Sequence, residues 1–230
     1  MENKDFWQVL KRLGIEYDEK KAQLLKDFFQ LLKEENEKFN LTRIIEEEEV
    51  YWKHYYDSLT IVEAVNMKDV QKVCDVGSGA GFPGIVLKIF FPHIELYLIE
   101  ATAKKTKFLQ MVIEKLALEC VFIVNERAEE VKKREYFDLV VSRATAPLPI
   151  IIEISMHLAK KNGKMIYYST NISREINLLG NKTGLALIDK KRIKLPDNKG
   201  ERVLICIEKN KETPLAYPRN YAQIKKKPMF

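Results

Sequence analysis

The spacing of hydrophobic residues along this chain changes near residue 70, from a helical period to short apolar runs. Before that point, apolar residues such as Phe28 and Leu32 recur at near-helical spacing among lysines and glutamates. This pattern predicts an amphipathic helix of about five turns. Glu46–Glu49 opens a second helical segment, because acids favour the first turn of a helix, and a further helix is predicted over 54–65. Residues 1–66 are therefore predicted to form an N-terminal helical extension.

Beyond residue 70, short apolar runs alternate with helical segments. The runs predict strands at 72–76, 94–99, 120–125, 137–142, 163–168, 185–190 and 203–208. Helices are predicted between them at 83–91, 103–117, 147–159 and 171–180. This alternation is typical of an α/β fold, with a mostly parallel sheet and helices on both faces. Residues 191–202 lack a helical pattern, so the last two strands are predicted to form an antiparallel pair at one edge.

A glycine-rich loop follows the first predicted strand, whose end carries Asp75. Glycines occupy positions 77, 79, 81 and 84, and Pro83 stands where a helix would begin. Glycine is favoured where the backbone takes a positive φ or approaches a ligand closely. A strand, such a loop and a helix place backbone N–H groups at the carboxyl edge of a sheet, where open α/β folds bind nucleotides. The sequence therefore predicts a cofactor site at this edge.

Two cofactors are compatible with this loop. Residues 79–84 match the G-x-G-x-x-G pattern of dinucleotide sites, which is a weak signal by itself. Glu100 ends the second strand and is placed to accept hydrogen bonds from ribose hydroxyls of either cofactor. Asp75 would repel a pyrophosphate but attract the ammonium group of a methionine moiety. S-adenosylmethionine is therefore favoured over NAD.

The composition is that of an ordinary soluble protein, with 46% apolar and 31% charged residues. No apolar run reaches the length of a membrane span, and the first residues lack the apolar region of a signal peptide, so a cytoplasmic protein is expected. Cys74, Cys120 and Cys206 lie in apolar runs without a C-x-x-C pair, which predicts buried thiols. The histidines are not paired at ligand spacing, so no metal site is expected.

The charge is concentrated at the C-terminal end of the chain. Residues 182–230 carry a net charge of +8, whereas residues 1–181 carry −2. The basic excess ends in Lys225-Lys226-Lys227, within a predicted basic tail over 210–230. Such asymmetry favours a polyanionic partner. A solubilising tail without a partner is the alternative.

Several stretches outside the glycine loop are similar in order and spacing to those of a known protein family. Those before the loop are Asn40–Arg43, His54 and Asp57–Leu59, and those after it are Glu100–Leu109, Arg127–Glu130, Ser142–Ala144, Gly200–Arg202 and the segment 217–228. In order and spacing they resemble the bacterial ribosomal RNA small subunit methyltransferase G family, formerly called glucose-inhibited division protein B. The resemblance implies a class I S-adenosylmethionine-dependent methyltransferase fold, with its seven-stranded methyltransferase domain over 67–209.

The resemblance also implies methylation of guanine N7 in the 530 loop of 16S ribosomal RNA, with S-adenosylhomocysteine as product. N7 carries an unprotonated lone pair at neutral pH, so no general base is expected. No catalytic residue is assigned, although Arg143 is a candidate at the acceptor site. The expected cofactor-binding residues are Asp75, Gly77, Gly79, Gly81, Phe82, Glu100, Ala101, Thr102, Ala128, Glu129 and Arg143.

The partner implied by the resemblance is 16S ribosomal RNA or the 30S subunit, and a monomer is taken as the default. The expected RNA-binding residues are Arg43, His54, Arg192, Arg202, Arg219, Lys225, Lys226 and Lys227. One departure is that Tyr168-Ser169-Thr170 stands where related sequences often have Lys-Gly. How the RNA docks at this point is therefore left open.

Three other functions are compatible with parts of this pattern. A methyltransferase that acts on another RNA, a protein or a small molecule would share the cofactor motifs. An NAD-dependent oxidoreductase has only the literal G-x-G-x-x-G in its favour. A non-enzymatic RNA-binding protein would explain the basic C-terminal segment but not the glycine loop with Glu100.

Overall fold

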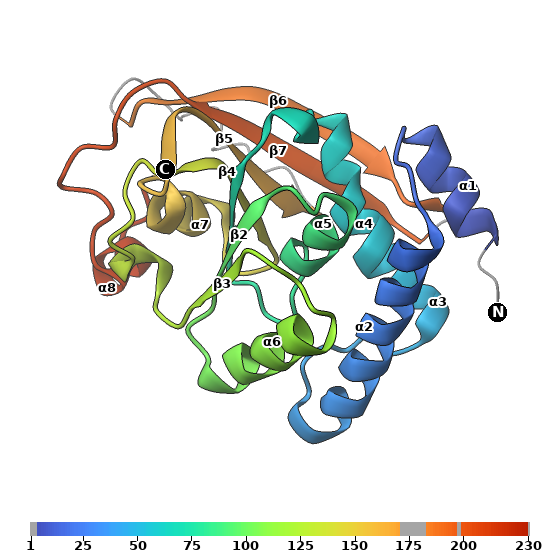
Figure 1. Ribbon diagram of the computed structural model, residues 1–230. Coiled ribbons are helices and arrows are strands. Elements are labelled where there is room, and N and C mark those ends of the chain that lie inside the picture. The colour runs from blue at the N-terminus through green and yellow to red at the C-terminus, as the bar shows by residue number, and fades with distance from the viewer. Residues whose placement is uncertain (1–3, 171–182, 197–198, 230) are drawn as a thin grey trace.

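The computed structural model describes residues 4–170, 183–196 and 199–229. Within these residues, seven strands form one sheet in the order β3-β2-β1-β4-β5-β7-β6 (Figure 1). The strands are β1 (Lys72–Val76), β2 (Glu95–Ile99), β3 (Val121–Val124), β4 (Phe137–Arg143), β5 (Ala159–Ser169), β6 (Leu185–Lys194) and β7 (Glu201–Lys209). β1 to β5 pair in parallel, whereas β7 runs antiparallel between β5 and β6. The predicted mostly parallel sheet and the antiparallel final pair are confirmed.

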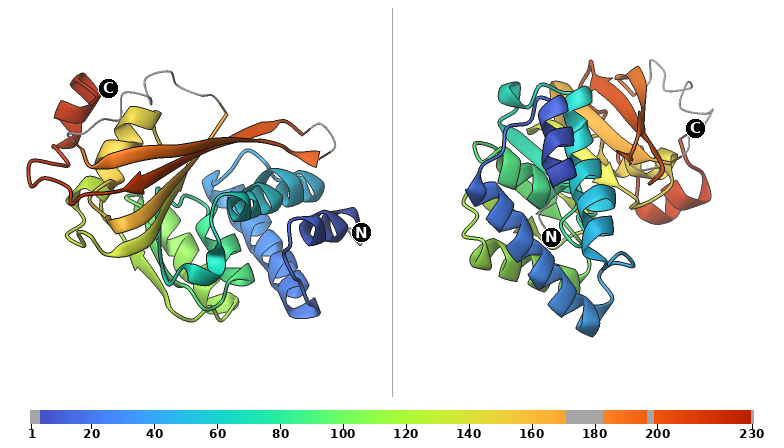
Figure 2. Two further views of the ribbon diagram at one scale, coloured as in Figure 1. Left: turned by 90° about the horizontal axis from the view of Figure 1, so that it is seen from above. Right: turned by 90° about the vertical axis from the view of Figure 1, so that its right-hand side faces the viewer.

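The α-helices cover both faces of this sheet. They are α1 (Lys4–Arg12), α2 (Glu19–Phe39), α3 (Glu47–Val50), α4 (Asp57–Leu59), α5 (Gly84–Phe90), α6 (Ala103–Lys115), α7 (Leu148–Ser155) and α8 (Tyr221–Lys226). Shorter helical turns are η1 (Tyr51–Tyr56), η2 (Thr60–Glu63), η3 (Met67–Asp69) and η4 (Ala128–Glu130). Helix α2 packs on α5 and α6 on one face, and α7 packs on α8 on the other (Figure 2). The predicted helix over 171–180 lies outside the described residues.

Alternate residues of each strand belong to two separate cores, as the two-residue period of a strand requires. Val73 and Leu98 contribute to the core beneath α2 and α5. Their neighbours Cys74 and Tyr97 contribute to the core beneath α7. The sheet is therefore buried on both faces along its centre. Cys120 is different, because it is exposed just before the edge strand β3, so the prediction of a buried thiol is wrong there.

The helix predicted over 54–65 is confirmed as far as residue 63, but it does not begin at residue 54. It belongs to one continuous helical segment over 47–63, of which η1 has π-helical geometry. In η1, Tyr51, Trp52, His54, Tyr55 and Tyr56 are all buried. A segment buried on every side has no polar face to set an α-helical period, which explains why the sequence pattern misplaced its boundaries.

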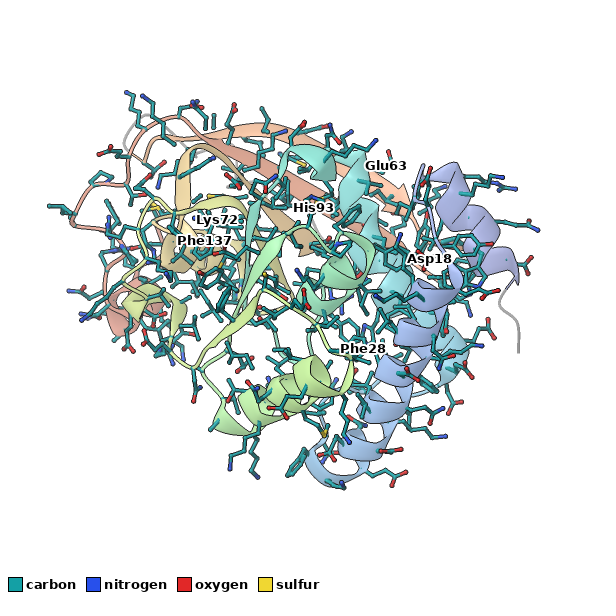
Figure 3. The ribbon with its side chains drawn as sticks, viewed as in Figure 1. Asp18, Phe28, Glu63, Lys72, His93 and Phe137 are labelled. Atoms are coloured by element: carbon teal, nitrogen blue, oxygen red, sulfur yellow. The ribbon has the colours of Figure 1, made fainter. Side chains whose placement is uncertain are left out.

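The N-terminal helices reach the glycine loop through an aromatic cluster. Phe28, on the side of α2 that faces the sheet domain (Figure 3), is fully buried. Its ring centroid lies 5.2 Å from that of Phe82 and 5.9 Å from that of Tyr55. The N-terminal helices therefore pack against the glycine loop through Phe82. None of the helices in the described part of the chain has both the length and the apolar character needed to cross a membrane.

Candidate cofactor and acceptor site

A pocket of about 700 Å³ lies at the carboxyl edge of the sheet. Its volume falls within the range of roughly 300–1,000 Å³ that is typical of ligand sites. Residues that follow β1, β2, β3 and β4 line it, together with residues of the N-terminal helical segment. Because β7 is antiparallel to β5, its first residues also lie at this edge, and Arg202 lines the pocket. The edge therefore gathers residues that are far apart in the sequence.

The glycine loop forms one wall of this pocket. Gly77, Gly79 and Gly81 have φ values of 71°, 57° and 93°, which are unfavourable for residues with a side chain. The N–H of Gly77 donates to the carbonyl of Ile99 at 2.8 Å, which ties the loop to β2. An added Cβ at Gly79 would meet no atom closer than 3.8 Å, so this glycine lies next to open space. The loop thus leaves room for a ligand beside Gly79.

The carboxylate of Glu100 is oriented by the backbone on both sides of it. Oε2 accepts from the N–H of Gly79 at 3.0 Å, and Oε1 accepts from the N–H of Thr102 at 2.8 Å. The side-chain amide of Asn125 donates to the carbonyl of Glu100 at 2.8 Å. Each carboxylate oxygen has further lone pairs. The buried carboxylate can therefore accept hydrogen bonds from a vicinal diol such as that of a ribose.

Asp75 is completely buried beneath the loop and does not line the pocket. Its Oδ2 accepts from the N–H of Gly84 at 2.9 Å, whereas Oδ1 has no partner among the described residues. Burial raises the pKa of Asp75 to about 7, although the hydrogen bond from Gly84 and the charge of Arg143 oppose this shift. A buried, unpartnered carboxylate oxygen near the loop fits the presence of a cationic group in the pocket.

Asp75 is expected to make the free protein less stable as the pH rises from about 4 to 8. The folded-state pKa lies above the unfolded value of about 3.9, so the folded state binds more protons in this range. Asp75→Asn lacks this titration, so its free energy of unfolding should rise relative to that of the wild type as the pH rises. Urea unfolding at several pH values measures the difference in the free energy of unfolding between the two proteins. Groups that titrate in the same way in both proteins do not contribute to this difference. A difference independent of pH would contradict the prediction.

Ala128 and Glu129 follow β3 and line the pocket on that side. Ala128 is buried, and Oε1 of Glu129 accepts from Nε of Arg127 at 2.7 Å. The guanidinium of Arg127 also lies 4.2 Å from the ring centroid of Tyr221, the first residue of α8. Arg127 and Tyr221 line the pocket, and sequence reasoning did not assign either of them to the cofactor site. No local motif marks Tyr221, because α8 is distant in sequence from the other lining residues.

Arg143, His54 and Phe82 line another part of the pocket and contact one another. His54 stacks on Phe82 with ring centroids 4.4 Å apart, and its Nδ1 accepts from Nη2 of Arg143 at 3.0 Å. Its Nε2 lies 3.2 Å from Oγ1 of Thr42, to which it can donate. Burial, followed by the charge of Arg143, lowers the pKa of His54 to about 3. His54 is therefore a neutral imidazole with its proton on Nε2.

The pocket brings together most of the predicted cofactor-binding residues. Gly77, Gly79, Phe82, Glu100, Ala101, Ala128, Glu129 and Arg143 line it, whereas Asp75, Gly81 and Thr102 are not among its lining residues. Sequence reasoning gave no role to Thr42, Asp57 or Ser78, which also line it. Asp57 lies in one of the stretches on which the family resemblance rests, and this position could have indicated that it belongs to the site.

The predicted RNA-binding residues are spread over several surfaces. His54 and Arg202 line the pocket, while Arg43 and Arg192 are exposed outside it. Lys225, Lys226 and Lys227 are exposed at the end of α8. The guanidinium of Arg219 donates to both carboxylate oxygens of the fully buried Glu153, at 2.7 and 2.6 Å. Arg219 therefore has a structural partner within the protein.

The pocket fits S-adenosylmethionine by the chemistry of its wall. Gly79 gives room for close approach, Glu100 provides acceptors for a diol, and Asp75 has a carboxylate oxygen beneath the loop, unpartnered within the described part of the chain, that a cationic group would attract. Among the described residues, no group of three or more His, Cys, Asp or Glu side chains is arranged to hold a metal ion.

This topology, with a glycine loop after β1 and an acid after β2, defines the class I methyltransferase fold. The fold is similar to that of *Burkholderia thailandensis* 1,6-didemethyltoxoflavin-N1-methyltransferase, a crystal structure with bound S-adenosylhomocysteine. The TM-score is 0.52 at 12% identity, covering 68% of this chain and 77% of that chain.

Residues 21–205 match the family model described as rRNA small subunit methyltransferase G, and the chain belongs to this family. Curated relatives agree over most of the chain. The ribosomal RNA small subunit methyltransferase G of *Mycoplasma capricolum* is 47% identical, with 86% of this chain and 87% of that protein covered. The protein of the same name from *Lactobacillus acidophilus* is 38% identical, with both chains fully covered.

Proposed function

We propose that this protein transfers a methyl group from S-adenosylmethionine to N7 of a guanine in the 530 loop of 16S ribosomal RNA. The family match over residues 21–205 carries this proposal. The pocket supports it, because Gly79 and Glu100 meet there at a hydrogen-bonding distance of 3.0 Å. Within the bacterial cell, a 16S RNA or 30S substrate would place the enzyme in the cytoplasm.

The residues on the β2 and β3 side of the pocket would hold the nucleoside part of the cofactor. Glu100, which the N–H of Thr102 orients, would accept from the ribose diol, and the backbone of Ala101 would line the same rim. Ala128 and Glu129 would contact the adenine, and Asp75 would attract the methionine ammonium. When bound, the cofactor supplies an electrophilic methyl group on a positively charged sulfur.

The protein's own contribution would be alignment and exclusion of water rather than proton transfer. Guanine N7 attacks with a lone pair that carries no proton, so no group has to remove one. The only histidine in the pocket wall among the described residues, His54, is neutral and engaged by Arg143 and Thr42. Phe82 and Ile44 supply apolar surface on the same wall.

The decisive experiment uses 16S RNA and 30S subunits from cells that lack this enzyme. Each substrate is incubated with the protein and labelled S-adenosylmethionine, and 7-methylguanosine is mapped by borohydride and aniline cleavage. We expect cleavage at the 530 loop. Cleavage elsewhere, or label in another RNA, a protein or a small molecule, would show a methyltransferase with a different acceptor. Absence of transfer to both substrates despite cofactor binding would refute the ribosomal assignment.

The three lysines at the end of α8 are expected to strengthen RNA binding through phosphate contacts. Each such contact contributes about 0.7–0.9 to the slope of log K against log salt, so replacing Lys225, Lys226 and Lys227 with alanine should flatten that slope by roughly 2. Filter binding of 16S RNA between low and physiological salt measures this change. Alanine replacements of the exposed Lys20, Lys26 and Lys33 on α2 remove the same charge elsewhere. Equal slopes in the two triple variants would exclude a specific role of the tail.

A further inference from the structure

A fully buried carboxylate holds two arginines at the acceptor side of the pocket. Oδ2 of Asp57 accepts from Nη1 of Arg143 at 2.8 Å, and Oδ1 accepts from Nε of Arg202 at 2.7 Å. The Asp57 side chain is 0% exposed, compared with 11% for Arg143 and 18% for Arg202. One negative charge therefore faces two positive charges, and the cluster retains a net charge of +1.

His54, Lys53 and Lys199 do not change this balance of one negative and two positive charges. His54, which contacts Arg143, is neutral. Lys53 is paired with Glu49, and Lys199 is paired with Glu48, so both lysines have acidic partners of their own at the rim. The cluster is thus a positively charged part of the pocket wall, and it would attract an anionic ligand group.

The two arginines differ in the hydrogen-bonding capacity that remains. Nη1 of Arg143 donates to Asp57 and to the carbonyl of Lys53, and Nη2 donates to His54. Arg202 uses only Nε, for Asp57. Among the residues that the structure describes, neither Nη1 nor Nη2 of Arg202 has a hydrogen-bond partner. Arg202 therefore presents two terminal nitrogens that a ligand can use.

The strand order places Arg202 away from the nucleoside side of the pocket. Glu100 follows β2, which lies on one side of β1, whereas β7 lies three strands away on the other side. At about 4.8 Å per strand, β7 is roughly 14 Å from β1 along the sheet. Arg202 is thus on the acceptor side, with Arg143 between it and the glycine loop.

The chemistry of the transfer indicates which acceptor group Arg202 can bind. Arginine often pairs with both O6 and N7 of guanine, but here the N7 lone pair must attack the methyl group. A positive charge also moves from sulfur to the guanine ring, and a guanidinium against the ring would oppose it. A phosphate avoids both conflicts and matches the planar fork of a guanidinium.

We propose that Arg202, held in place by Asp57, binds the phosphate of the nucleotide that is methylated. This inference rests on the proposed function, and it assigns to the pocket a phosphate subsite for the flipped-out guanosine. Asp57 is a positioning residue, because its carboxylate keeps two guanidinium groups together that would otherwise repel each other. The antiparallel direction of β7 is what brings Arg202 to this edge.

The test compares Arg202→Gln and Arg202→Lys with Arg12→Gln, which removes an exposed arginine on α1. Binding of S-adenosylmethionine by calorimetry should stay within about twofold in all three variants. We expect Arg202→Gln to lower kcat/KM for the RNA substrate by roughly 10- to 100-fold, as loss of charge-assisted hydrogen bonds implies. Arg202→Lys should recover part of this loss, because an ammonium still binds phosphate. Weaker cofactor binding in Arg202→Gln would show that Arg202 serves the cofactor and would overturn the proposal.

A second measurement identifies the phosphate directly. Guanosine 5′-monophosphate and guanosine are compared as ligands of the protein saturated with S-adenosylhomocysteine. The wild type should bind the nucleotide at least about tenfold more tightly than the nucleoside, and Arg202→Gln should bind the two equally. Retained preference in Arg202→Gln, or no preference in the wild type, including no detectable nucleotide binding, would refute the phosphate subsite.

These outcomes are separable from failure of the proposed function. If the wild type methylates neither 16S RNA nor 30S subunits, the ribosomal assignment fails whatever the nucleotide binding shows. Asp57→Asn adds a check on positioning, provided that thermal melting shows a folded protein. The double variant with Arg202→Gln should lose less kcat/KM than the product of the two single losses, because Asp57→Asn acts in part through the guanidinium of Arg202. Additive losses would show that Asp57 does not act through Arg202.

Discussion

Replacing Glu100 with alanine should weaken the binding of S-adenosylmethionine severely while leaving the protein folded. The carboxylate would supply the acceptors for the ribose diol, and it also fixes the N–H groups of Gly79 and Thr102. Two hydrogen bonds to a charged group contribute about 1.5–3 kcal/mol each, so their loss would raise Kd by a factor on the order of 100 to 10,000. Isothermal titration calorimetry measures this change directly.

Matched variants separate the loss of the carboxylate from a general effect of the substitution. Glu100→Gln keeps one acceptor oxygen, and we expect it to bind the cofactor more weakly than the wild type but better than Glu100→Ala. Glu114→Ala removes an exposed carboxylate on α6, outside the pocket, and should bind normally. The melting temperature of Glu100→Ala should change by only a few degrees, because solvent in the pocket can reach the released N–H groups. Cofactor binding by Glu100→Ala within threefold of the wild type would contradict this assignment.

The sequence was sufficient to predict the parts of the site that depend on local chain geometry. The loop from Gly77 to Gly84 and the acid at Glu100 follow consecutive strands, and parallel strands bring their carboxyl ends to one edge. Strand β1 has the predicted bounds, and β2 differs from its predicted bounds by a single residue. Here the two-residue alternation, the glycines and the order of elements all indicate the same arrangement.

The parts that sequence reasoning missed depend on contacts between distant segments. Asp57 meets Arg143 and Arg202 across separations of 86 and 145 residues, and no periodicity reports such a contact. Arg219 is a different case, because its partner Glu153 is a single acid within the apolar helix α7. A buried carboxylate requires a cationic partner, so Glu153 was a usable signal that Arg219 has a structural role.

Alanine substitutions at Gly77 and Gly79 should have large but different effects. The two glycines look equivalent in the sequence, but in the structure they differ in the space available for a side chain. A Cβ at Gly77 would collide with the Cγ2 and Oγ1 atoms of Thr145 and lie 2.9 Å from its Cβ. Oγ1 of Thr145 is itself held by hydrogen bonds to Ser142 and Val76, so the side chain cannot move away freely. A Cβ at Gly79 would meet only the carbonyl oxygen of Gly77, at 3.8 Å.

Gly77→Ala should therefore lower the free energy of unfolding by about 2–5 kcal/mol, from left-handed backbone strain of about 1–2 kcal/mol and overpacking of about 1–3 kcal/mol. Gly79→Ala has only the strain term, and its stability should fall by about 1–2 kcal/mol. Its new methyl group would instead point into the space beside Glu100, so cofactor binding should weaken at least tenfold although the fold is kept. Urea unfolding and calorimetry on the two variants measure both effects. If Gly79→Ala lost as much stability as Gly77→Ala, or bound the cofactor normally, the space beside Gly79 would not be the cofactor cradle that its geometry indicates.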